Sequence, residues 1–224
     1  MKSTLAQRLV AEALGTAFLL AAVVGSGIMA ANLSGGNAAL ALLCNTLPTG
    51  AILAVLILMF GPVSGAHFNP AVSIAFALRG ELTARALLLY VAGQIIGGIA
   101  GVWAAHLMFE LPLWQLSATV RTGPGQWFAE GVATFGLLMT ILGCVAHTPA
   151  SVPYAVGLYI TSAYWFTAST SFANPAVTIA RSLSDTFAGI APTGVIAFTG
   201  AQLLGMLVAV ALARWLWRQT KAAV

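Results

Sequence analysis

The triplet Asn-Pro-Ala occurs twice in the chain, at Asn69-Pro70-Ala71 and at Asn174-Pro175-Ala176. Asn is a strong N-cap residue and Pro is favoured in the first turn, so each triplet predicts the start of a helix. The side-chain oxygen of a capping Asn bonds to the helix, which leaves its NH₂ group free to donate to a solute. Two such NH₂ groups would form a station with hydrogen-bond donors only. A water bound there accepts a hydrogen bond from both groups, and this orientation interrupts the chain of hydrogen-bonded waters along which a proton could hop. A single triplet is also compatible with an ordinary loop turn, so the prediction of one shared midplane station in a pore depends on whether the fold brings the two helix starts together.

The residues just before each triplet, 64–68 and 169–173, include Ser, Thr, Gly and Ala and supply backbone that need not be helical. At membrane depth, such backbone is tolerated only where it lines a wet cavity or is buried in protein. Its carbonyl oxygens can then form a ladder of hydrogen-bond acceptors along a pore. The candidate pore-lining residues of these segments are Gly65, Ala66, His67, Phe68, Thr170 and Phe172.

The composition identifies the surrounding medium as lipid. Of the 224 residues, 60% are hydrophobic and 6% are charged, whereas an ordinary soluble domain has about 25% charged residues. So few charges cannot cover a soluble surface, and the scattered basic residues lack the clustering that nucleic-acid binding needs. Six apolar stretches are long enough to be membrane spans: they are 9–31, 40–60, 84–108, 127–146, 153–169 and 192–217.

Two shorter apolar segments, 69–78 and 174–183, are each about half a membrane thickness long and belong to an internal repeat. They agree at seven of ten positions, and the pairs Glu12/Glu130 and Gln94/Gln202 recur around them in the same order. Each half holds three spans, an odd number, so the second half is inverted relative to the first. Two half-helix N-termini, each with about half a positive charge, then face one midplane and repel cations and hydronium.

Four polar residues inside the spans, Glu12, Glu130, Gln94 and Gln202, are candidates for a function because ionisable or polar groups are rare in lipid. One interpretation is a proton relay through the carboxylates. We favour a structural role, in which each Glu accepts backbone N–H bonds from the segment before a half-helix. Each Gln then makes a hydrogen bond between helices.

The basic residues indicate the orientation of the chain. With six spans, one membrane face carries Arg121 and Arg181, and the other carries Lys2, Arg8, Arg79, Arg85, Arg214, Arg218 and Lys221. By the positive-inside rule, both termini are expected in the cytoplasm. The chain is then a single domain, 1–224, with a first inverted repeat at 1–110, an extracellular linker loop at 111–126 and a second inverted repeat at 127–224.

These motifs resemble those of the major intrinsic protein family, the aquaporins and aquaglyceroporins. The stretch Ser64–Val72 is very similar to the family's first signature loop, and the resemblance covers nearly the whole chain. It implies an all-α membrane protein with six tilted transmembrane helices plus two half-helices, assembled as a homotetramer with one pore per subunit. It also implies passive conduction of water and small neutral solutes without a cofactor, and a place for His67 near the cytoplasmic side of the pore.

The family's second constriction lies near the outer mouth, and its four positions map by spacing onto Thr49, Ser162, Ser171 and Val177. The resemblance implies that water-selective members have Phe, His, a small residue and Arg at these four positions, and that glycerol channels have Trp, Gly, Phe and Arg. This chain has no aromatic residue, His or Arg there. The resemblance therefore implies a wide selectivity filter with three hydroxyls and one branched apolar side chain.

Two details of this filter stay open. A slip of one turn in the fifth span would replace Ser162 by Tyr159 or Phe166. Arg181 follows Val177 by one helical turn and is either a displaced charge in the vestibule or an interfacial residue. We favour the second alternative, in which Arg181 pairs with Asp185 or serves only as a topology charge.

The filter is similar to that of bacterial aquaglyceroporins associated with arsenic resistance. This likeness implies glycerol-like polyols, trivalent arsenic and antimony hydroxides, methylated arsenicals and water as solutes, and a bacterial inner membrane as the location. A proton-coupled secondary transporter is the alternative, because such transporters also use inverted repeats and broken helices. An enzyme is not expected, since no nucleophile, base or metal-ligand set is grouped in the sequence.

Overall fold

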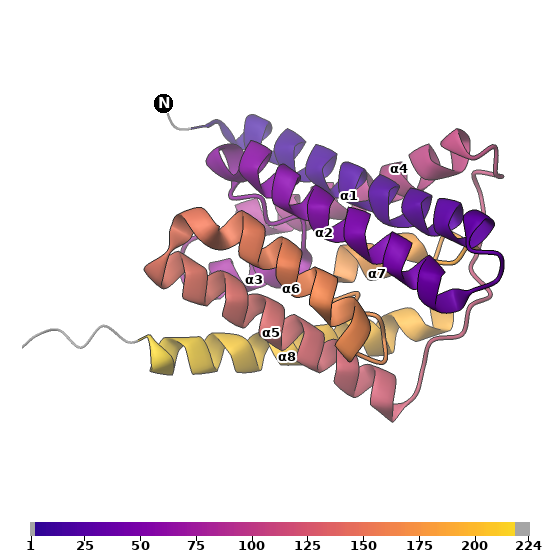
Figure 1. Ribbon diagram of the computed structural model, residues 1–224. Coiled ribbons are helices and arrows are strands. Elements are labelled where there is room, and N and C mark those ends of the chain that lie inside the picture. Colours follow the sequence, from indigo (N-terminus) through magenta and orange to yellow (C-terminus); the bar gives the residue numbers. More distant parts are fainter. Residues whose placement is uncertain (1–2, 218–224) are drawn as a thin grey trace, which may run out of the picture.

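Six longer helices surround two short ones in residues 3–217, which are the part of the chain that the computed structural model describes (Figure 1). This architecture confirms the predicted all-α membrane fold. The α-helices are α1 Leu5–Leu33, α2 Ala38–Ser64, α3 Pro70–Leu78, α4 Ala84–Met108, α5 Pro124–His147, α6 Val152–Phe166, α7 Pro175–Arg181 and α8 Pro192–Leu216. A short 3₁₀ turn, η1 Pro149–Ser151, precedes α6.

The helix boundaries follow local capping. Helix α1 begins about one turn before the predicted start, because Thr4 and Gln7 form a reciprocal capping box that stabilises the first turn. Five helices, α1, α2, α4, α5 and α8, are long and apolar enough to cross a membrane, whereas α6 has only 15 residues. The span predicted at 153–169 thus ends earlier, at Phe166, because Thr167 takes an extended backbone that leads into the segment before α7.

The two half-helices α3 and α7 lie in the interior, where each packs against both α4 and α8. The longer helices pair within each half, α1 with α4 and α5 with α8, and α2 meets α6 across the halves. Glycine makes the pairs close: a Cβ added at Gly97 would lie 2.1 Å from the Ala13 carbonyl oxygen, and one at Gly205 would lie 2.2 Å from that of Gly131. Small residues at such crossings are typical of helix packing in lipid.

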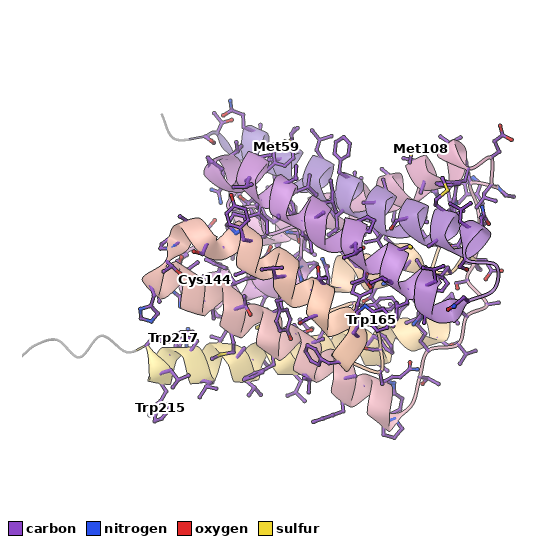
Figure 2. The ribbon with its side chains drawn as sticks, viewed as in Figure 1. Met59, Met108, Cys144, Trp165, Trp215 and Trp217 are labelled. Carbon is purple, nitrogen blue, oxygen red and sulfur yellow. The ribbon has the colours of Figure 1, made fainter. Side chains whose placement is uncertain are left out.

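The outer faces of the bundle are apolar. Ile196 is 84% exposed and Leu88 is 71% exposed, and the side chains of Met59, Met108 and Trp215 also lie on the outside (Figure 2). Water would oppose such a surface, whereas lipid accepts it. The chain is therefore a multi-pass membrane protein.

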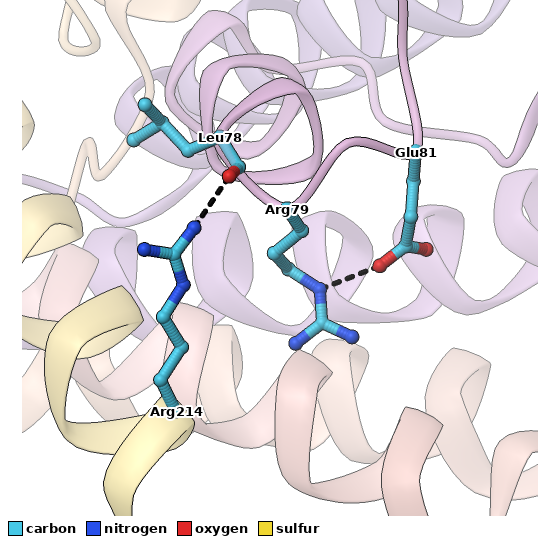
Figure 3. Close-up of polar contacts among 4 residues, drawn as sticks. All are labelled: Leu78, Arg79, Glu81 and Arg214. Atoms are coloured by element: carbon cyan, nitrogen blue, oxygen red, sulfur yellow. Dashed lines mark hydrogen bonds and ion pairs between the residues drawn. The ribbon is translucent and has the colours of Figure 1, made fainter.

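The bundle has two distinct ends. We call the end where α1 begins and α8 finishes the termini end, and the opposite one the linker end (Figure 1). At the termini end, Arg214 of α8 donates to the Leu78 carbonyl at the end of α3, and Arg79 pairs with Glu81 at 2.6 Å (Figure 3). Lys2, Arg218 and Lys221, which the orientation argument also uses, lie outside the described residues.

At the linker end, the connection between α4 and α5 packs against the segment that follows α7. The backbone N–H of Ser117 donates to the Ser182 carbonyl at 3.0 Å, and the N–H of Ala191 donates to the Thr119 carbonyl at 2.7 Å. The linker thus packs against the C-terminal end of the second half-helix.

Candidate functional site

The two Asn residues cap their half-helices and also clamp the two halves together. The Oδ1 atom of Asn69 accepts the backbone N–H of Ala71, and that of Asn174 accepts the N–H of Ala176, each at 2.9 Å. The Nδ2 of Asn69 donates to the Ala173 carbonyl, and the Nδ2 of Asn174 donates to the Phe68 carbonyl, each at 2.8 Å. The prediction of a wholly free NH₂ group is therefore wrong, because one of its two protons serves the clamp and one remains.

The carboxylate of Glu12 holds the segment before α3. Its oxygens accept the backbone N–H groups of His67 and Phe68 at 2.9 and 2.7 Å. The side chains of Ser64 and Gln94 donate to it at 2.6 and 2.7 Å. These are the bonds expected of a structural carboxylate, and they occupy both of its oxygens.

Glu130 repeats this arrangement in the second half. It accepts the N–H groups of Phe172 and Ala173 at 2.8 and 2.9 Å, and Gln202 donates to it at 2.6 Å. Glu12 and Glu130 are both fully buried. The two segments before the half-helices are thus held by equivalent charged acceptors.

The held segments have a strained backbone. Ala66 and Phe68 have φ values of 51° and 48°, and the equivalent residues Ser171 and Ala173 have values of 52° and 48°. A residue other than glycine is rarely left-handed, and each such residue costs about 1–3 kcal/mol unless its surroundings impose the conformation. The carboxylates supply that constraint, because they bond the N–H groups inside these turns.

The segments face a cavity of about 110 Å³, which is well below the size of a typical drug-binding pocket. Rows of apolar side chains at helical spacing form most of its wall. They are Leu19 and Val23 of α1, Leu53 and Ile57 of α2, Leu137, Ile141 and Val145 of α5, and Val152, Val156 and Ile160 of α6. A narrow cavity with a polar backbone strip opposite apolar walls suits one small, hydrogen-bonding solute.

Most residues that were expected along the pore reach this cavity. Gly65, Ala66, His67, Phe68, Asn69, Phe172 and Asn174 all line it. Thr170 is half-buried and is not part of the wall. The Pro and Ala of each triplet are buried around the Asn residues: Pro70, Ala71, Pro175 and Ala176.

Three of the four expected filter residues, Thr49, Ser171 and Val177, line the cavity. Ser162 does not: it is exposed, and its hydroxyl donates to the Tyr159 carbonyl at 3.1 Å. On α6 it is Tyr164 that lines the cavity: its side chain is buried and its hydroxyl lies 3.4 Å from that of Thr49, so an aromatic side chain faces the cavity where none was expected.

The register of α6 explains this correction. Its wall residues follow one another every fourth position from Val152 to Tyr164, which keeps them on one face of the helix. Ser162 falls between two of them, on the opposite face. The alternatives Tyr159 and Phe166 also lie off the wall, so the apolar periodicity within α6 was the signal that could have found Tyr164.

Arg181 also lines the cavity, and the interfacial interpretation is wrong. The side chain is only 2% exposed, its Nε donates to the Ala188 carbonyl, and its Cζ lies 3.4 Å from the centre of the Phe172 ring. The carboxylate of Asp185 instead accepts the Ala118 N–H at 2.8 Å. The carbonyl that anchors Arg181 has no sequence signal, which is why its position was not predicted.

Comparison with known proteins gives a consistent result. The sequence profile of the family described as "Major intrinsic protein" matches residues 1–152. The chain is 60% identical to the aquaglyceroporin AqpS of Rhizobium meliloti (strain 1021) over 212 residues, which cover 95% of this chain and 91% of that protein. It is 35% identical to nodulin-26 of Glycine max over 66% of this chain and 55% of that protein.

Among solved structures, the aquaglyceroporin from Plasmodium falciparum matches with a TM-score of 0.69 over 98% of each chain. The sequence identity is 22%, so this likeness concerns the fold. It extends the match beyond residue 152, where the family profile stops, to the second half-helix and α8.

Proposed function

The chain belongs to the major intrinsic protein family and is a membrane channel rather than an enzyme, and on that premise we propose which solutes it passes. The proposed solutes are water, glycerol-like polyols, trivalent arsenic and antimony hydroxides, and methylated arsenicals. The observation that carries the proposal is the pair of Asn residues clamped at one point of a narrow cavity. Solute movement through the cavity is passive in this proposal, because binding at the Asn pair needs only hydrogen bonds and no coupled ion.

Selection against charge begins at the Asn pair. Each Asn keeps one N–H proton beyond the clamp, so the station offers donors and no side-chain acceptor. The N-termini of α3 and α7 add about half a positive charge each. A cation meets this field in a cavity with apolar walls, where screening is weak, while a neutral hydroxyl can accept a hydrogen bond and pass.

Selection by size in our proposal depends on the missing Arg, because Val177 stands at its position, and no longer on a filter without an aromatic side chain, because Tyr164 replaces Ser162. The proposed filter consists of Thr49, Tyr164, Ser171 and Val177, which all line the cavity; the Tyr164 hydroxyl donates to that of Thr49 at 3.4 Å. The Ser171 hydroxyl is buried and has no hydrogen-bond partner among the described residues, so it is available to a solute. Arsenic and antimony trihydroxides are neutral at pH 7 and present hydroxyls as a small polyol does, so the same donors and acceptors suit them.

The assembly and location are proposed as follows. The subunit forms a homotetramer in a bacterial inner membrane, with the termini end in the cytoplasm. Arg8, Arg79, Arg85 and Arg214 all belong to that end, which agrees with the positive-inside rule. We assign a first inverted repeat to 1–110, an extracellular linker to 111–126 and a second inverted repeat to 127–224.

Proteoliposome swelling followed by stopped-flow light scattering tests this function. We expect glycerol, urea and arsenite to enter with a low activation energy and without an effect of a proton ionophore. The alternative, a proton-coupled transporter, requires a titrating group in the transport path. The carboxylates of Glu12 and Glu130 are instead bonded to backbone and Gln side chains, and the His67 imidazole, which lines the cavity, is bonded through Nδ1 to the Ser73 hydroxyl. Uptake that saturates and is abolished by the ionophore would favour the transporter and overturn the channel.

A further inference from the structure

The inverted repeat places a stacked pair of side chains at equivalent positions in both halves of the pore. In each half, one member lies two residues before the capping Asn and the other lies seven residues after it. In the first half these are His67 and Phe76, with ring centres 4.8 Å apart. In the second half they are Phe172 and Arg181, and the guanidinium lies on the Phe ring. All four residues line the cavity.

We propose that Arg181 is the charge-selecting residue of the pore at its linker end, and that it donates a hydrogen bond to the oxygen of a passing solute. The internal repeat carries this assignment, because the equivalent residue in the first half also lines the pore. The inference rests on the proposed function as a channel for neutral solutes. It adds a cationic site that the four-residue filter does not contain.

The guanidinium is held in place by a built cradle. Arg181 donates from Nε to the Ala188 carbonyl, and Arg121 donates to the carbonyls on either side, from Nε to Gly189 at 2.8 Å and from Nη2 to Phe187 at 3.4 Å. Three consecutive carbonyls thus hold two guanidinium groups. The Cζ of Arg121 also lies 5.3 Å from the centre of the Phe172 ring, so both cations use the same aromatic side chain.

Within the described part of the chain, no carboxylate lies within ion-pair distance of this cradle. Among residues 3–217, the ion pair of the structure is Arg79 with Glu81, at the other end of the bundle. Asp185, the acidic residue that follows Arg181 most closely, is bonded to the backbone of Ala118. Two fixed positive charges therefore remain beside the linker-end mouth, where apolar walls limit their screening.

One donor of Arg181 is left for the solute. Its Nη1 atom is buried and has no hydrogen-bond partner in the described part of the chain. A buried donor without a partner is unfavourable, and an oxygen with a lone pair in the cavity, from a hydroxyl or a carbonyl, would relieve it. Since Arg181 lies about 6 Å along the helix from Val177, it adds charge selection without narrowing the filter.

Urea and guanidinium form a matched pair for the test, because they have nearly the same size and shape and differ in charge. Uptake of each into proteoliposomes is measured for the wild type and for Arg181→Leu. We expect the wild type to admit urea and exclude guanidinium. In Arg181→Leu, the guanidinium-to-urea ratio should rise at least about tenfold, as expected when a weakly screened unit charge beside the path is removed.

Two further variants control the result. Arg181→Lys keeps the charge and should keep guanidinium excluded, while it loses the planar stacking on Phe172 and lowers urea uptake. Arg85→Leu removes an exposed charge from the termini end and should leave both solutes unchanged. If Arg181→Leu does not reach the membrane in folded form, Arg181→Gln removes the charge and retains a donor for the Ala188 carbonyl.

The two proposals fail in different ways. An unchanged guanidinium-to-urea ratio in a folded, water-conducting Arg181→Leu or Arg181→Gln channel would overturn the role of Arg181 and leave the channel function intact. Loss of guanidinium exclusion in Arg181→Lys would also overturn it. A wild type that admits neither urea nor glycerol would overturn the proposed function itself.

Discussion

The half-helices α3 and α7 begin in the same way and differ toward their other ends. Each begins at an Asn that bonds the opposite segment, and each is preceded by turns that a buried Glu holds. Seven residues after the Asn, however, α3 presents Phe76 to the cavity and α7 presents Arg181. The features that both copies share hold the backbone in place, whereas the positions at which they differ give the two mouths different chemistry.

The largest effect is expected from the shared carboxylates. Glu12→Leu or Glu130→Leu would leave two backbone N–H groups and one of the two N–H bonds of a Gln amide without an acceptor, and each buried orphan costs about 1–3 kcal/mol. We expect both variants to lose several kcal/mol of stability and most of the folded protein, measured by size-exclusion chromatography and thermal unfolding in detergent. Glu→Gln at either site is the milder control. If one copy tolerated the change, the two halves would not be held equivalently.

The glycine crossings should rank next. Gly97→Ala in the first half and Gly205→Ala in the second place a Cβ against backbone oxygen, and such overpacking typically destabilises by about 1–3 kcal/mol. Gly200→Ala is the matched control, because nothing lies within 4 Å of an added Cβ there. Midpoints of thermal unfolding should fall for the first two variants and stay unchanged or rise for the control. A tolerated Gly97→Ala would contradict the close packing of α1 on α4.

The Asn pair should show a smaller loss of stability and a clear loss of selectivity. Asn69→Asp and Asn174→Asp keep the capping oxygen but replace the donor with a negative charge. We expect stability to fall by about 1 kcal/mol, the value of the lost hydrogen bond from Nδ2 to the opposite carbonyl, and proton leak into proteoliposomes to increase in both variants. A pH-sensitive dye inside the vesicles measures the leak, and a leak in one variant alone would show that the two donors are not equivalent.

The smallest effect is expected at the termini end. Arg214 donates to the last carbonyl of α3, in an exposed position. Cations at a helix C-terminus stabilise it by about 0.3–1 kcal/mol at low ionic strength. Arg214→Ala should therefore lower the unfolding midpoint slightly at low salt and less at high salt. An effect as large as that of the Glu variants would mean that this contact secures the half-helix.

The sequence predicted the shared features better than the differing ones. The helix starts at Asn69 and Asn174 and the bonds of Glu12 follow from capping chemistry and from the repeat, which are both local patterns. Ser162 was misplaced because a fixed spacing was carried over from a family, whereas the register of α6 decides which side chain faces the cavity.

Arg181 was misassigned for a different reason. Its position depends on the carbonyls of residues 187–189 and on the Phe172 ring, and backbone acceptors have no sequence signal. One clue was present in the repeat itself: Phe76 and Arg181 occupy equivalent positions and differ in type. A mismatch inside a closely matching repeat indicates where the two halves have separate tasks.

The central claim is that the second half-helix sets solute selection, and Val177→Arg tests it most directly. This variant adds a cation to the filter where this chain has an apolar side chain. Water, glycerol and arsenite permeabilities are measured in the same proteoliposome preparation, with Val72→Ile as a conservative control at the equivalent site of the first half. We predict that Val177→Arg lowers glycerol and arsenite permeability at least about tenfold, the effect of roughly 1.4 kcal/mol on a barrier, and lowers water permeability much less. Unchanged glycerol and arsenite permeability would contradict the claim that the second half-helix sets solute selection.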